Sequence, residues 1–271
     1  MMELTRFTRW QDLTTEEMRL LAARDPVVIL PLAAIEQHGP HLPLSTDLEI
    51  GLGLLQAAAA SVEMAQGVLQ LPPMMIGTSM EHEGFPGTLS LEPETALAVI
   101  AQYGAAVAAA GFRRLVLVNS HGGNTQVMEL AALRLRRDHG LLTVNCSYFR
   151  LPPPADLALP ADEIQHGIHG GAVETAMMLH LAPGAVRMDA CTEAVSMGQE
   201  LARTMTLVGV VAPAPMAWLS RDLHRSGAVG NPLLADAALG RQLVLHYGQA
   251  IAQVIRETAE FPLDRLRPVR P

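Results

Sequence analysis

Carboxylate and imidazole side chains of the kind that bind divalent metals gather in two short segments of this 271-residue chain. Glu36 and His38 are two residues apart, a spacing that places both side chains on one face of an extended segment. Asp47 follows a loop rich in proline and glycine and opens a predicted helix, from which its two oxygens can bridge two metals. His121 belongs to the second segment. Mixed carboxylate and imidazole ligands suit Zn²⁺, Mn²⁺ or Fe²⁺, so these residues predict a metal site.

Each of these residues also has an ordinary structural alternative. Glu36 would be a solvated acid in a loop, and Asp47 would cap its own helix. His38 and His121 would be buried histidines with ordinary hydrogen bonds. The combination favours the metal site, because all of these ligand-type residues follow the ends of two predicted strands.

A third segment, HGIHGGAVET, contains His166, His169 and Glu174. His169 precedes a Gly-Gly pair, from which its ring can project into a cleft. Glu174 falls in the first turn of the next predicted helix, where its alternative role is to complement the helix dipole. His169 and Glu174 are therefore candidate catalytic residues.

Candidate substrate contacts lie beside these segments. Ser79, Glu81 and His82 belong to a loop that follows another apolar run, and ordinary loop residues are the alternative interpretation. Small or polar residues next to His121 leave space for a substrate, and they are Gly122, Gly123 and Asn124.

Two continuous apolar runs position the first two segments. Val27 to Leu32 and Arg114 to Asn119 have the pattern of strands buried on both faces. Open parallel sheets bind ligands at the carboxyl ends of their strands, and these two runs lead directly into the segments of Glu36 and His121. The strands are thus expected to bring both segments to one edge of a sheet.

Helical and strand patterns alternate along the rest of the chain. Helices are predicted over Thr14 to Ala23, Asp47 to Met64, Pro93 to Ala110, Asn124 to Asp138, Ala172 to Leu181 and Pro232 to Ala259. Further strands are predicted within Val68 to Ile76, Leu141 to Cys146 and Leu207 to Val211, and a long loop over Leu151 to Gln165. No shift in composition marks a boundary. We therefore predict a single α/β domain over residues 1–271, with a mostly parallel sheet and helices on both faces.

Composition narrows the chemistry and the partners. All 19 basic residues are arginine, so Schiff-base lysines and P-loop lysines are excluded. The net charge of −8 argues against nucleic-acid binding. No apolar run reaches the roughly 18 residues of a membrane span, and the first 24 residues lack a signal core, so we expect a cytoplasmic protein without a membrane partner. Cys146 and Cys191 are expected to be buried, unpaired residues.

Five stretches match motifs of one known family and extend over most of the chain. They are EQHGPHLPLSTD (36–47), TSMEHEGFPGTLSL (78–91), NSHGGN (119–124), HGGAVET (169–175) and GAVGNPLLADAALG (227–240). On these motifs the chain resembles the creatininase (creatinine amidohydrolase) family. The resemblance implies a compact α/β fold, a homo-hexamer and a binuclear site, with Zn²⁺ as the first expectation and Mn²⁺ or Fe²⁺ as alternatives. It places Glu36 and His121 on one metal, His38 on the other, and Asp47 between them.

Two departures separate the chain from creatininase proper. That enzyme has a glutamate ligand two residues after the histidine of the NSHGGN motif, where this chain has Gly123. The wider family reads HGGN, and the resemblance then makes Glu174 the replacement ligand. Creatininase proper also closes tryptophans over creatinine from the region before HGGAVET, whereas this chain has only Trp10 and Trp218. Creatinine is therefore not the expected substrate.

Together these features predict a metal-dependent amidohydrolase that cleaves a cyclic amide or formamide-type C–N bond in a small molecule. A water between two metals attacks the carbonyl carbon, Glu174 or a neighbouring carboxylate takes its proton, and His169 stabilises the oxyanion or protonates the leaving nitrogen. Two alternatives keep the site: a lactone or cyclic-ketone hydrolase acting on a sugar or inositol derivative, and a peptide-cleaving family member. A non-catalytic metal-binding protein and a serine or cysteine hydrolase are less favoured.

Overall fold

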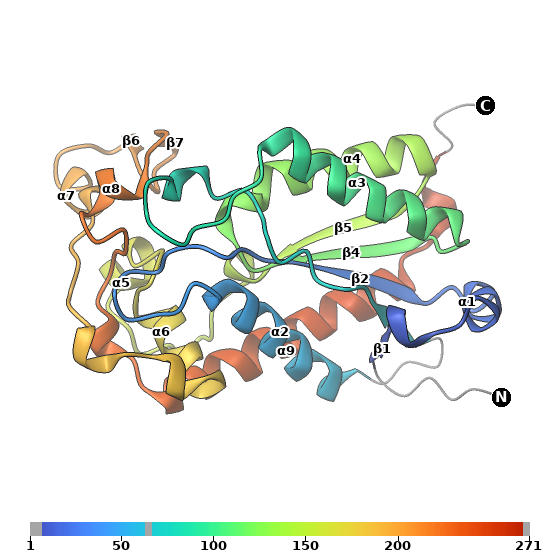
Figure 1. Ribbon diagram of the computed structural model, residues 1–271, viewed down its shortest axis with the longest axis horizontal. Coiled ribbons are helices and arrows are strands. Elements are labelled where there is room, and N and C mark those ends of the chain that lie inside the picture. The colour runs from blue at the N-terminus through green and yellow to red at the C-terminus, as the bar shows by residue number, and fades with distance from the viewer. Residues whose placement is uncertain (1–6, 63–66, 268–271) are drawn as a thin grey trace.

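The core of the computed structural model is a parallel sheet of five strands in the order β1-β3-β2-β4-β5 (Figure 1). The structure describes residues 7–62 and 67–267. The strands are β1 (Phe7–Arg9), β2 (Val27–Leu32), β3 (Val68–Gln70), β4 (Arg114–Asn119) and β5 (Leu142–Ser147). Every residue of β2 and β4 is buried, and their register pairs Leu32 with Asn119. The two strands therefore end at the same level, and the segments that follow leave the sheet side by side.

Helices cover both faces of this sheet (Figure 1). One face carries α2 (Thr46–Ser61), α6 (Ala172–Leu181) and α9 (Ala237–Glu260), and the other carries α1 (Thr15–Ala22), α3 (Pro93–Ala109) and α4 (Thr125–His139). Successive residues of β2 alternate between the two cores, with Ile29 on the first face and Leu30 on the second. The sheet is thus the middle of three layers, which explains why its central strands contain almost only apolar residues.

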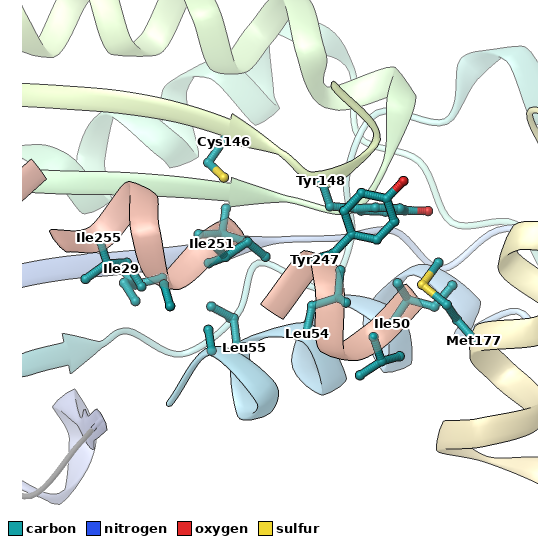
Figure 2. Packing of buried hydrophobic residues seen from close by; sticks show 14 of the residues in the cluster. Ile29, Ile50, Leu54, Leu55, Cys146, Tyr148, Met177, Tyr247, Ile251 and Ile255 are labelled. Carbon is teal, nitrogen blue, oxygen red and sulfur yellow. The ribbon is translucent and has the colours of Figure 1, made fainter. Parts of the chain in front are cut away.

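The packing of α2 against α9 fixes the start of α2, where Asp47 lies. Figure 2 shows Leu54 and Leu55 of α2 beside Ile251 of α9 in one apolar cluster. Gly248 lets the two helices approach closely, because a Cβ at this position would lie 2.5 Å from the Cβ of Ala57. Burying a leucine side chain stabilises a fold by about 1.5–3 kcal/mol, so this contact is a firm support for the helix that carries Asp47.

Shorter elements gather at the carboxyl end of the sheet (Figure 1). They are α5 (Ala161–His166), α7 (Met197–Leu201), α8 (Ser220–Leu223) and the paired two-residue strands β6 (Val208–Gly209) and β7 (Ala214–Pro215). Single-turn 3-10 helices connect several elements, and they span Trp10–Asp12, Met80–His82, Gly122–Asn124, Tyr148–Arg150, Pro183–Ala185, Met188–Ala190, Pro232–Leu234 and Leu263–Arg265. Among the described residues, no helix is both long and apolar enough to cross a membrane.

The predicted fold class, a single α/β domain with a parallel sheet and helices on both faces, is confirmed. The bounds of β2, β4 and α6 are those predicted. The helix predicted from Asp47 to Met64 runs from Thr46 to Ser61, and Met64 lies outside the described residues. Both cysteines are free and buried, as expected.

Three predictions of local structure were wrong in extent. The loop predicted over Leu151 to Gln165 contains α5, which begins after Pro160. The helix predicted from Pro232 begins at Ala237, because Asp236 caps it by accepting a hydrogen bond from the backbone N–H of Leu239 at 2.7 Å. The strand predicted within Leu207 to Val211 is only the two-residue β6.

Candidate metal centre

The segments that follow β2 and β4 bring the predicted ligands together at the carboxyl edge of the sheet. The backbone N–H of Ser120 donates to the carbonyl of Leu32 at 2.9 Å, which ties the two strand ends to each other. The chain after β2 then turns back on itself, and the N–H of Glu36 donates to the carbonyl of Leu44 at 3.0 Å. This return places the start of α2 beside the strand end, so Glu36 faces Asp47.

A first group of donors consists of Glu36, Asp47 and His121. Nδ1 of His121 lies 3.2 Å from Oε1 of Glu36 and 3.3 Å from Oδ2 of Asp47. All three residues are at most 3% exposed. Nε2 of His121 donates a hydrogen bond to the carbonyl oxygen of Thr78 at 2.6 Å, because a carbonyl can only accept. The lone pair of His121 is therefore on Nδ1, and it points at the two carboxylates.

A second group consists of His38, His169 and Glu174, whose donor atoms lie within 4.8 Å of one another. Nδ1 of His38 donates to the carbonyl of Glu36 at 3.1 Å, and Nε2 of His169 donates to the carbonyl of Gln37 at 2.7 Å. Each ring thus directs its other nitrogen into the group. Nε2 of His38 is 4.0 Å from Oε2 of Glu174, and the two histidine rings stack with centroids 4.2 Å apart.

Asp47 lies between the two groups. Its Oδ1 is 3.5 Å from Nε2 of His38, while its Oδ2 faces His121. Ser45 is the residue that precedes the helix, and the Asp47 side chain makes no capping hydrogen bond, so the helix-cap alternative for Asp47 is wrong. The solvated-loop alternative for Glu36 is wrong as well, because Glu36 is 1% exposed.

Several donor atoms at this centre have no hydrogen-bond partner. Three such atoms are buried and form no hydrogen bond with any residue that the structure describes: Oε2 of Glu36, Nε2 of His38 and Oδ2 of Asp47. A buried polar atom without a partner costs about 1–3 kcal/mol, more if it is charged. A pair of divalent cations would satisfy these atoms, and the mixed oxygen and nitrogen donors suit Zn²⁺, Mn²⁺ or Fe²⁺. The residues present therefore fit a two-metal site.

The pKa values of two histidines at this centre show that its carboxylates favour a positive charge beside them. Burial alone would lower the pKa of His38, but the carboxylates of Asp47, Glu174 and Glu36 together outweigh it and raise this pKa to about 10. Burial is likewise overcome at His121, where Glu36 and Asp47 together raise the pKa well above its usual range. When no metal is bound, protons on these lone pairs supply the positive charge. Metal binding is expected to release them, because only the unprotonated ring is a ligand.

Glu174 lies both at the start of a helix and in the second donor group, two positions that were predicted as alternatives. It lies in the first turn of α6, where Oε2 accepts a hydrogen bond from the backbone N–H of Gly170 at 2.6 Å. The same oxygen faces His38. Burial raises the pKa of Glu174 to about 7 despite the opposing effect of His38. The residue thus supports the helix start while its carboxylate points into the second donor group.

The position of Gly123 has no room for a side chain. A Cβ there would lie 2.2 Å from the carbonyl oxygen of Thr78, 2.5 Å from Nε2 of His121 and 2.7 Å from Oε1 of Glu81. The Glu81 carboxylate, 3.9 Å from Nε2 of His121, fills the space that a side chain of residue 123 would enter. A glutamate ligand at residue 123 is thus incompatible with this local structure.

Replacing Gly123 by alanine is expected to lower the free energy of unfolding by about 1–3 kcal/mol, because the new methyl group overlaps the backbone carbonyl that orients His121. Gly122→Ala is the matched control, since apart from its chain neighbours no described residue has a heavy atom within 4 Å of the added Cβ. The control is expected to stay within about 0.5 kcal/mol of the parent protein. Urea unfolding measures both, and equal loss in the two variants would contradict the packing argument.

The predicted substrate contacts have different surroundings: Ser79 and Asn124 connect the site loops, whereas His82 lies against the metal donors. Ser79 and Asn124 are fully buried. Ser79 Oγ lies 3.3 Å from Nε2 of His121, and the amide of Asn124 donates to the carbonyl of Ala33 and accepts from the N–H of Thr78. These contacts hold the site loops together. His82 instead lies against the donors, with Nε2 3.2 Å from Oε1 of Glu36.

His166 is separated from the metal donors. It lines a cavity of about 270 Å³ together with Glu163 and Glu193, and none of the metal donors lines this cavity. Glu163 accepts hydrogen bonds from the backbone N–H groups of Ala172 and Asn231 at 2.7 and 2.8 Å. This buried carboxylate therefore ties the start of α6, and with it Glu174, to the segment before α9.

Sequence reasoning missed two residues that touch the site histidines. Gln37 lies between Glu36 and His38 in the first motif, and its side chain contacts His82. Ser220 contacts the same ring from α8. The motif that contains Gln37 was a signal that could have singled it out. No pattern near Ser220 indicates its contact with a residue 138 positions earlier.

Comparison with known proteins gives the same assignment as the motifs. The family model for creatininase, described as creatinine amidohydrolase, matches residues 11–255. The chain is 33% identical over 243 residues to the mycofactocin precursor peptide peptidase of Mycolicibacterium smegmatis, and the match covers 85% of each chain.

Solved structures of creatininase share the fold. A manganese creatininase superimposes with a TM-score of 0.73 at 27% identity, covering 94% of this chain and 98% of that one. A mutant creatininase of the Zn–Zn type gives a TM-score of 0.72 at 26% identity, with the same coverage. Matched over most of its length by the family model, a curated relative and these structures, the chain belongs to the creatininase family of hydrolases.

Proposed function

We propose that this chain is a two-metal hydrolase that cleaves an amide-type C–N bond. The observation that carries the proposal is the position of Asp47, whose two oxygens face two separate groups of buried donors. Glu36, Asp47 and His121 would hold one ion, and His38, Asp47 and Glu174 the other. Zn²⁺ is the first choice and Mn²⁺ or Fe²⁺ the alternatives. When bound, such ions supply a water of lowered pKa and a Lewis acid for the carbonyl oxygen.

His169 is proposed to move a proton. The hydrogen bond from its Nε2 to Gln37 leaves the lone pair on Nδ1, which lies 3.8 Å from Oε1 of Glu36. Burial, followed by the neighbouring His38 and His82, lowers the pKa of His169 well below its usual range, so the ring is neutral. A neutral ring with this tautomer accepts a proton and can pass it to a leaving nitrogen. It does not stabilise an oxyanion directly, because Nδ1 carries no hydrogen.

The first candidate substrate is a small molecule with a cyclic amide or formamide-type C–N bond. A peptide is the second candidate, and the identity to a peptide peptidase over 85% of this chain favours it. Creatinine is a disfavoured substrate, because both tryptophans of this chain lie outside the region from which creatininase proper closes tryptophans over creatinine. Trp10 packs on Phe112 near the opposite end of the sheet, and Trp218 packs against the small apolar cluster of Val210 and Leu223. The homo-hexamer remains part of the proposal, and light scattering would measure it.

Replacing His121 by alanine is expected to remove at least one bound metal and to lower turnover by on the order of 10³-fold, since loss of Lewis-acid assistance costs several kcal/mol. Metal content after dialysis and turnover of formamides, cyclic amides, short peptides and lactones measure the effect. Unchanged activity in a metal-loaded His121→Ala protein would refute the scheme. Turnover of lactones alone would move the assignment to the lactone hydrolase.

A further inference from the structure

We propose that His82 is not a metal ligand but a fixed hydrogen-bond donor, which leaves one oxygen of Glu36 for the metal. The inference rests on the proposed function, because it assigns a role relative to a metal held by Glu36. His82 is a positioning residue in this scheme, since it acts on the metal through Glu36.

The position of His82 alone is ambiguous. The ring is 2% exposed and stacks against His169 with centroids 4.3 Å apart. One donor atom each from Glu36, His82 and His169 lies within 4.8 Å of the others, which is the spacing of a third metal site. If Nε2 of His82 carries no hydrogen, it can bind a metal. If Nε2 carries the hydrogen, it donates a hydrogen bond to Glu36 instead.

Gln37 supplies the first step, because its amide orientation is fixed by the backbone. The backbone N–H of Gly39 donates to Oε1 of Gln37 at 2.9 Å. Nε2 of Gln37 donates to the carbonyl oxygen of Gly227 at 2.8 Å. A backbone N–H can only donate and a carbonyl can only accept, so a flipped amide would lose both hydrogen bonds.

The second step follows from the contact between Gln37 and His82. Nε2 of Gln37 lies 2.7 Å from Nδ1 of His82. The same amide nitrogen lies 3.1 Å from Nε2 of His169, but that atom carries a hydrogen because it donates to the carbonyl oxygen of Gln37. The second amide hydrogen is therefore left for His82, and since an amide nitrogen has no available lone pair, Nδ1 of His82 accepts it. The hydroxyl of Ser220 has one hydrogen and two acceptors within reach, Nδ1 of His82 at 2.7 Å and the carbonyl oxygen of Glu81 at 2.9 Å, so Gln37 alone fixes the tautomer. Nδ1 of His82 therefore carries no hydrogen, and the ring hydrogen is on Nε2.

The consequence concerns the carboxylate of Glu36. Nε2–H of His82 lies 3.2 Å from Oε1 of Glu36 and donates to it. Oε2 of the same carboxylate is buried, and within residues 7–62 and 67–267 no group forms a hydrogen bond with it. Oε1, which also faces Nδ1 of His121 at 3.2 Å, is thus held in place by His82, and Oε2 is the oxygen left for a metal. Because a protonated nitrogen cannot ligate, the Glu36, His82 and His169 group is not a metal site, and the centre holds two ions rather than three.

Metal affinity tests the role of His82 in the full-length protein. His82→Phe keeps a ring but removes the donor, and we expect it to weaken Zn²⁺ binding about 10- to 100-fold, as for other groups that orient metal ligands. His82→Gln retains an amide N–H near the Nε2 position and is expected to recover most of the affinity. His224→Phe is the matched control, because His224 contacts Ser226 outside the donor groups. Competition with a chromogenic chelator gives the dissociation constants and the number of ions bound.

The tautomer itself is measured by two-bond ¹H–¹⁵N correlation spectra, with the His82 signals identified by their loss in His82→Gln. An Nε2–H pattern in the metal-free and Zn²⁺-loaded protein is expected. An Nδ1–H pattern, a zinc-bound Nε2, or loss of a third ion in His82→Phe would overturn the proposal. Wild-type Zn²⁺ affinity in His82→Phe would do so too. Absence of stoichiometric metal binding by the parent protein would instead overturn the proposed function, while the metal-free spectrum still decides the tautomer.

Discussion

Replacement of Asp47 by asparagine is expected to lower turnover by about 10³-fold or more and to reduce the bound metal from two ions to at most one. Asparagine has nearly the same shape as aspartate, so the buried start of α2 should persist. The variant loses the negative charge, and one of its two terminal atoms becomes an amide N–H₂ that cannot ligate. Since Oδ1 faces His38 and Oδ2 faces His121, either orientation of the amide abolishes one of the two contacts. Loss of Lewis-acid assistance worth several kcal/mol corresponds to this change in rate.

Glu49→Gln is the control for this experiment. Glu49 is an acid in the same first turn of α2, but its side chain is exposed. It should retain both metals and full turnover. Metal analysis and steady-state kinetics on the same samples, together with thermal unfolding, separate loss of metal from loss of fold. Two ions bound to a folded Asp47→Asn protein would rule out a bridging role for Asp47.

Replacement of His169 by glutamine is expected to lower kcat about 10²- to 10⁴-fold, the usual contribution of a group that transfers protons. A glutamine amide can still donate to the carbonyl of Gln37, as Nε2 of His169 does at 2.7 Å, so the loop should keep its position. The variant lacks the basic Nδ1. KM should change little and both metals should remain, because the proposed role of His169 is confined to proton transfer.

The same variant shows whether His169 transfers protons or binds a metal. His169 belongs to one of the donor groups, and its ring stacks on His38. Loss of one ion in His169→Gln would make it a ligand and contradict the proton-transfer role. An unchanged kcat with both ions present would show that neither role is needed. His166→Gln, in the neighbouring cavity, is the matched control and should leave kcat intact.

The predicted ligands could be found in the sequence because two physical rules act together on them. Buried parallel strands have nearly continuous apolar sequences, so β2 and β4 were recognised with correct bounds. Parallel strands also end at one edge, so the residues that follow them must meet. Glu36 and His121 come together for this reason, although they are 85 positions apart in the sequence.

Other features of the fold and the site could not be predicted, because no rule of this kind applies to them. β1 has three residues and joins the edge of the sheet through its pairing with β3, and a strand this short has no periodicity. α5 follows a proline-rich stretch, which favours a loop in any local analysis. The tautomer of His82 depends on Gln37, whose own orientation depends on Gly227, 190 positions later. Hydrogen bonds of this range are fixed by tertiary packing alone.

The contact between α2 and α9 has a consequence for the chain during its synthesis. No residue of α9 belongs to the metal-donor groups, yet α2, whose first turn contains Asp47, packs against this helix. Domains complete their packing only after the ribosome has released the segments involved. A nascent chain that has emerged from the ribosome as far as Glu174 therefore contains every proposed ligand. It still lacks α9, which supports the helix that carries Asp47. We expect the metal site to reach its final geometry only once α9 has packed against α2.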